Sequence, residues 1–170
     1  MNAKALTGLK GTNMLSHKLV ASIEDHSERL TAAVTERIRR DPELACIGRL
    51  RDSELREIGF ELLHNLGAWL AGENREAIAS RYEEIGRRRY AEQIPLHECV
   101  RSLHIVKYET VDFIRNQGFP QTSLEIYAEE ELEHRLNRSV DSLVYHLVRG
   151  YEAALRNTNR KTQDAIARQA

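Results

Sequence analysis

The feature that most constrains the fold is a long apolar repeat towards the C-terminal end of the chain. After Thr122, apolar residues recur at every third or fourth position, which predicts one amphipathic helix. Its inner track consists of Ala128, Leu132, Leu136, Val140, Leu143, Leu147, Tyr151 and Ala154. Thr122 and Glu125 have the spacing of a capping box, and no proline follows Pro120. A helix of about 45 residues would extend roughly 65 to 70 Å, farther than a domain of this size, so part of it must kink or project.

Four further amphipathic helices are expected ahead of this one. They cover residues 15–40, 52–70, 75–90 and 96–117. The first ends at Asp41 and Pro42, because a proline and the residue before it leave the helical conformation. We expect Asn74 to cap the third helix and Pro95 to occupy the first turn of the fourth.

Glycines and the absence of strand patterns complete this interpretation. Gly59 and Gly67 lie inside the second helix, where each costs on the order of 1 kcal/mol relative to Ala, so we expect them to permit a close helix crossing. Gly118 fits a left-handed cap after the fourth helix, and Pro120 prevents its continuation. No segment alternates as a strand does, and no internal repeat occurs. The predicted fold class is all-α.

Length and charge describe one soluble domain. The chain has 170 residues, with 25 Lys and Arg against 26 Asp and Glu, so no excess of positive charge points to nucleic acid. No segment approaches the roughly 20 apolar residues that cross a bilayer, so no membrane insertion is expected. Cys46 and Cys99 are too few for a disulfide scaffold, and no secretory signal precedes them. We therefore expect a cytoplasmic protein.

Histidines are the first candidates for cofactor chemistry. His97 and His104 are seven residues apart on the fourth helix, about 10 Å, which is too far for both to bind one ion. Either one alone could hold haem, although a satisfied helical histidine is the more common outcome. Glu131 and His134 form a carboxylate-x-x-His pattern, but the second such motif that a di-metal bundle needs is missing. No metal site is predicted.

Other motifs give little support to catalysis. Arg87, Arg88 and Arg89 could recognise phosphate or an acidic partner helix, but such a run at a helix end is more often solvated. Cys99 is expected to be a buried, inert thiol. The sequence has neither a nucleophile elbow nor a glycine-rich nucleotide loop, so we do not expect an enzyme.

One segment carries a family resemblance. Residues 81–104 read RYEEIGRRRYAEQIPLHECVRSLH, a helix, an Ile-Pro junction and a second helix. This segment resembles the N-terminal sensory domains of RsbR-type stressosome co-antagonists, which are similar to globins without haem and also precede histidine kinase and other output domains. The resemblance implies a globin-like bundle of about five to six helices with a long C-terminal helix. It also implies a dimer whose last helix runs into an output domain.

These observations give one leading hypothesis and one alternative. The division expected is an N-terminal arm at residues 1–13, a helical sensory domain at 14–155, and a polar helix extension or linker at 156–170. The leading function is a homodimeric signalling input module that relays a conformational change to a histidine kinase or STAS-type partner; the 170 residues include no STAS-like domain. The alternative is a sensor of haem or of a small ligand, with His97 or His104 facing an apolar pocket between the third, fourth and fifth helices.

A dimer needs apolar surface that one bundle leaves over. We expect the first and last helices to supply it as a four-helix contact across a twofold axis. The residues assigned to this contact are Leu19, Ile23, Leu30, Val34, Val140, Leu143, Leu147 and Tyr151. The alternative is that both apolar stripes are used entirely inside the core of one chain.

Overall fold

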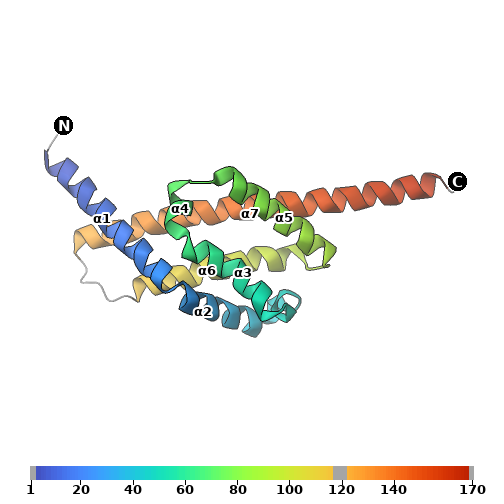
Figure 1. The fold of residues 1–170 in the computed structure, drawn as a ribbon, viewed down its shortest axis with the longest axis horizontal. Helices are drawn as coiled ribbons and strands as arrows, with labels where there is room; N and C mark the ends of the chain where they lie inside the picture. The colour runs from blue at the N-terminus through green and yellow to red at the C-terminus, as the bar shows by residue number, and fades with distance from the viewer. Residues whose placement is uncertain (1–2, 117–121, 169–170) are drawn as a thin grey trace.

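The computed structural model describes residues 3–116 and 122–168, which form seven α-helices, two 3₁₀ turns and no strand (Figure 1). The all-α prediction is therefore confirmed. The helices are α1 (Ala3–Asp25), α2 (Ser27–Arg40), α3 (Asp52–His64), α4 (Leu66–Ala71), α5 (Arg75–Ala91), α6 (Leu96–Arg115) and α7 (Ser123–Ala167). The 3₁₀ turns η1 (Pro42–Leu44) and η2 (Ile47–Arg49) join α2 to α3.

The long C-terminal helix is present as predicted. It runs for 45 residues, and its capping box is formed. The amide of Glu125 donates a hydrogen bond to Thr122 Oγ1, and the amide of Thr122 donates one to Glu125 Oε2. The residues from Leu155 onward are exposed, and Figure 1 shows this end extending past the other helices. Of the two outcomes left open, kinking or projecting, α7 projects.

Two of the predicted helices are divided, which raises the number of helices from the expected five or six to seven. The break in the first is at His26, whose backbone leaves the helical region and whose ring Nδ1 lies 2.8 Å from the carbonyl oxygen of Ser22. The break in the second is at Asn65, whose side-chain amide donates to the carbonyl of Glu61. Side chains that compete for backbone groups loosen a helix at that point. Helix α1 also begins at Ala3, within the segment expected to be an arm.

The remaining boundaries lie close to the expected ones. Asn74 directly precedes α5, but it has a left-handed backbone with φ of 55° and its side chain makes no capping hydrogen bond. Pro95 directly precedes α6 and occupies the capping position. Gly118 and Pro120, expected to end that helix, lie outside the described residues.

Helices α5 and α7 approach each other through two glycines, Gly86 and Gly150, which we call the glycine crossing. A Cβ on Gly86 would overlap the carbonyl oxygen of Leu147 and lie 2.8 Å from the amide nitrogen of Tyr151. A Cβ on Gly150 would overlap the carbonyl oxygen of Glu83. The two backbones are therefore in direct contact, and α5 lies along α7 (Figure 1).

The two glycines expected at a crossing behave differently from each other. A Cβ on Gly67 would lie 3.2 Å from the Glu24 carboxylate, which also accepts a hydrogen bond from the Gly67 amide. A Cβ on Gly59 would lie 3.8 Å from Thr31, an ordinary van der Waals distance. The expectation of a close crossing holds at Gly67, whereas Gly59 leaves room for a methyl group.

Candidate functional site

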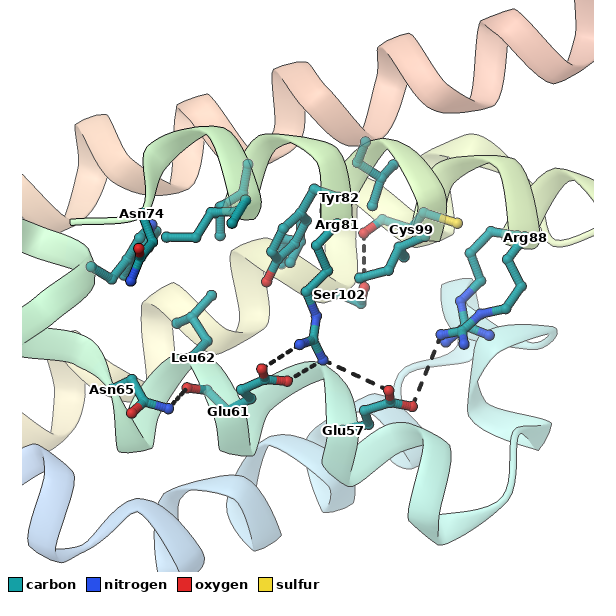
Figure 2. A pocket seen from close by; sticks show the side chains of 18 of the residues that line it. Glu57, Glu61, Leu62, Asn65, Asn74, Arg81, Tyr82, Arg88, Cys99 and Ser102 are labelled. Carbon is teal, nitrogen blue, oxygen red and sulfur yellow. Dashed lines mark hydrogen bonds and ion pairs between the residues drawn. The ribbon is translucent and has the colours of Figure 1, made fainter. Parts of the chain in front are cut away.

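A cavity of about 560 Å³ lies between α3 and α4 on one side and α5 on the other, with α6 and α7 behind it (Figure 2). Its volume is within the roughly 300–1,000 Å³ of small-molecule sites. The apolar side chains that line it come from all five helices and from η2. They are Ile47, Leu62, Ala68, Trp69, Ala77, Ile78, Tyr82, Ile85, Leu103, Leu143 and Leu147.

Helix α5 supplies one wall of the cavity. Ile78, Tyr82, Ile85 and Arg89 are spaced by three or four residues and so share one helix face, and all four line the cavity. Burial raises the pKa of Tyr82, so its phenol is neutral at physiological pH. The apolar face of α5 is thus turned towards an open space rather than packed fully against α3.

Ion pairs cross the mouth of the cavity. Arg81 of α5 pairs with Glu61 and lies 3.7 Å from Glu57, both on α3, and Arg88 lies 4.0 Å from Glu57 (Figure 2). These side chains are about half exposed. Ion pairs in such positions contribute little to stability because water screens them. These ion pairs therefore add little to the stability of the contact between α3 and α5.

Arg89 stands apart from its two neighbours in the basic run. Its side chain is only 1% exposed, Nη1 donates to Glu92 Oε2 at 2.6 Å, and Nη2 has no hydrogen-bond partner. Arg87 instead pairs with Glu84 at the surface. The expectation of a solvated helix end holds for Arg87 and Arg88 but is wrong for Arg89, because α5 continues to Ala91 and carries Arg89 onto its inner face.

Two polar groups of α6 also reach the cavity. Cys99 is buried, as expected, and burial raises the pKa of its thiol to about 11, so almost none is thiolate at neutral pH. The hydroxyl of Ser102 donates to the carbonyl of Cys99 at 2.8 Å and keeps its lone pairs free. This end of the cavity offers hydrogen-bonding groups but no activated nucleophile.

The two candidate histidines do not line this cavity. His97 is exposed in the first turn of α6, and His104 is half-buried, with a pKa that burial lowers. A histidine that holds haem must direct a ring nitrogen at the iron, and among the described residues no histidine lines this cavity. Nor do the described residues contain a group of three His, Cys, Asp or Glu placed to hold a metal ion.

Seven of the eight residues assigned to a dimer contact are buried within the single chain. Only Tyr151 is half-exposed, and its hydroxyl donates to the carbonyl of Ile94 at 3.0 Å. Both apolar stripes are therefore used inside the chain's own core, which is the alternative that the sequence left open. A second copy would need another surface.

One polar and one aromatic side-chain contact join α5 to α7 near the point where α7 leaves the bundle. His146 Nδ1 lies 3.2 Å from Glu83, and the rings of Tyr90 and Tyr151 meet edge to face at 5.3 Å. Together with the glycine crossing, these contacts join the cavity wall to the projecting helix.

Comparison with protein families bears on the whole of this arrangement. The family model described as the RsbT co-antagonist protein rsbRD N-terminal domain matches residues 18–166. The chain belongs to this family. The match runs from α1 through the exposed end of α7, so the projecting turns are part of the rsbRD N-terminal domain. This is a family of signalling input domains of the stressosome type.

Two further comparisons, with curated proteins and with solved structures, identify no similar protein. The likeness of this rsbRD N-terminal domain to globins therefore stays a prediction. Among the described residues, no helix is both long enough and apolar enough to span a membrane.

Proposed function

We propose that this rsbRD N-terminal domain is a cytoplasmic, homodimeric input module whose signal leaves through α7. The observation that carries the proposal is the exposed end of α7, a continuous helix from Leu155 to Ala167 that the family match covers up to Ile166. A helix has no core of its own and is stabilised by packing against a partner. The partner proposed is the same helix of a second copy, followed by an output domain such as a histidine kinase or a STAS-type protein.

The contacts between α5 and α7 support a route for the signal. Direct backbone contact at Gly86 and Gly150 leaves no soft side chain to absorb a displacement of α5. A shift of α5 therefore moves α7 or breaks the crossing, and a stiff helix carries such a shift outward. The proposed role is binding and relay, without a catalytic step.

The exposed end of α7 also offers a face for pairing. Leu155, Thr162 and Ile166 are separated by seven and four residues, which places them on one side of the helix. Leu155 and Ile166 are among the large apolar side chains that one chain leaves exposed. We propose that this face, rather than the buried stripes expected from the sequence, joins the two copies.

Light scattering at tens of micromolar tests the dimer. The intact chain is expected at twice its mass of 19.6 kDa, and the double variant Leu155→Glu with Ile166→Glu is expected at 19.6 kDa with unchanged helicity, because both side chains are exposed. The matched control, Asn157→Glu with Gln163→Glu, adds the same charge on other faces and should stay dimeric. A monomeric wild type, or a double variant that stays dimeric, contradicts the proposal.

The alternative function is a sensor of haem or of a small ligand. No described histidine lines the cavity, so the cavity supports the small-ligand sensor and not a histidine-bound haem.

A further inference from the structure

We propose that the cavity binds a monocarboxylate with an apolar body, and that Arg89 holds its carboxylate. This inference concerns binding alone and stands whether or not α7 pairs or relays a signal. It rests on the combination of an apolar cavity and a buried arginine that lines this cavity and has one donor nitrogen without a hydrogen-bond partner.

The free donor is the unusual feature. Buried polar groups in proteins are nearly always hydrogen-bonded, and a buried charge with an unused donor is costly. Arg89 Nη2 has no partner, although the side chain is almost fully buried and lines the cavity. Carboxylate and phosphate oxygens are the acceptors that form the strongest hydrogen bonds with a guanidinium group. A bound carboxylate would therefore satisfy the group that the chain leaves unpaired.

The surrounding charges favour a singly charged head group. Arg89 already pairs with Glu92, so a phosphate dianion would add two negative charges beside a neutral pair, whereas a monocarboxylate adds one. The cations at the mouth are matched as well, since Arg81 and Arg88 face Glu57 and Glu61. Arg89 is thus the donor with unused capacity, whereas the Ser102 hydroxyl already donates to the carbonyl of Cys99 and offers a ligand only its lone pairs.

The rest of the cavity fits an apolar body. Its interior is formed by aliphatic and aromatic side chains from α3 to α7, and burial of apolar ligand surface there is favourable. The ion pairs at the mouth are half exposed, so a ligand can part them at low cost. An unbranched chain with one carboxylate combines both requirements.

Calorimetric titration with octanoate and with octanamide tests the proposal. The two probes have the same chain, and only octanoate carries a charge. Wild-type protein is expected to bind octanoate at least ten times more tightly than octanamide. Arg89→Gln should lose this preference, with octanoate affinity falling about tenfold, whereas the control Arg87→Gln should behave as wild type because Arg87 lies on the surface.

A second variant keeps the test decisive if Arg89→Gln does not fold. Ala77 lines the cavity and its side chain is exposed, so a larger residue there should not disturb the core. The variant Ala77→Trp should therefore fold, fill the opening of the cavity and abolish binding of both probes. No saturable octanoate binding to wild type, equal affinity for octanamide, or unchanged binding in Ala77→Trp overturns the proposal. Undiminished octanoate binding in folded Arg89→Gln overturns the role of Arg89.

Discussion

Gly86→Ala and Gly150→Ala should each lower the free energy of unfolding by about 3 kcal/mol, at the upper end of the cost of overpacking. In both cases the new methyl group would meet backbone atoms of the opposing helix, not the end of a flexible side chain. Helices α5 and α7 would have to separate, and the contacts around Tyr151 would separate with them. Urea unfolding followed by circular dichroism measures the change.

Gly59→Ala is the matched control for these variants. Its methyl group would lie at 3.8 Å from Thr31, and alanine favours a helix by up to about 1 kcal/mol over glycine, so this variant should be neutral or stabilising. The double variant of Gly86 and Gly150 should cost less than the sum of the single variants, because one separation relieves both clashes. If all three single variants behaved alike, the crossing would not be a close contact.

Glu98→Ala should lower the free energy of unfolding by a similar amount, about 3 kcal/mol. The side chain is 4% exposed, and its Oε2 accepts hydrogen bonds from the amides of Cys46 at 2.9 Å and Ile47 at 2.8 Å. Alanine would leave these amides without their acceptor and would free the turn η2 from α6. Ile47 lines the cavity, so the cavity wall would loosen as well.

Glu98→Gln keeps the space that the side chain fills and one acceptor oxygen, and removes only the negative charge. Glutamine keeps a carbonyl oxygen of similar reach, so the expected cost is about 1 kcal/mol, a third of the cost of alanine. The same urea unfolding measures both variants. Equal losses for glutamine and alanine would show that the acceptor at Cys46 and Ile47 is not what stabilises this turn.

The parts of the fold that follow from local periodicity could be predicted from the sequence. The track from Ala128 to Ala154 and the capping box at Thr122 give α7 its start and its buried face. Pro42 and Pro95 fix boundaries because proline limits the backbone wherever it occurs. Such signals act within a few residues of each other, so one sequence is enough to read them.

The parts that depend on which helices meet could not be predicted in the same way. Nothing local distinguishes Gly59, which has space beside it, from Gly150, which touches the backbone of α5. The break at His26 involves no proline or glycine, and its local feature is a His26 Nδ1 that lies 2.8 Å from the carbonyl oxygen of Ser22. A glycine inside a helix lowers the stability of that helix, so the positions of Gly86 and Gly150 indicate a close packing contact. They do not indicate which helix makes that contact.

The candidate site was missed for a related reason. Arg89 belongs to a run of three arginines, and charge alone predicts that all three are solvated. Its position on the apolar face of α5, eleven residues after Ile78, was the signal that it points inward. The buried stripes of α1, α2 and α7 show the converse, since amphipathicity predicts that a face is covered but not whether the same chain covers it.

The distance between two spin labels tests most directly whether α7 helices of two copies pair. The label is placed at Gln163→Cys in a Cys46→Ser background, because Cys99 is buried and its thiol is protonated. Packed helix axes lie about 8–10 Å apart, so the account predicts one narrow distribution at roughly 20–40 Å once the label arms are included. Absence of a dipolar signal at tens of micromolar, or a broad distribution beyond this range, would contradict it.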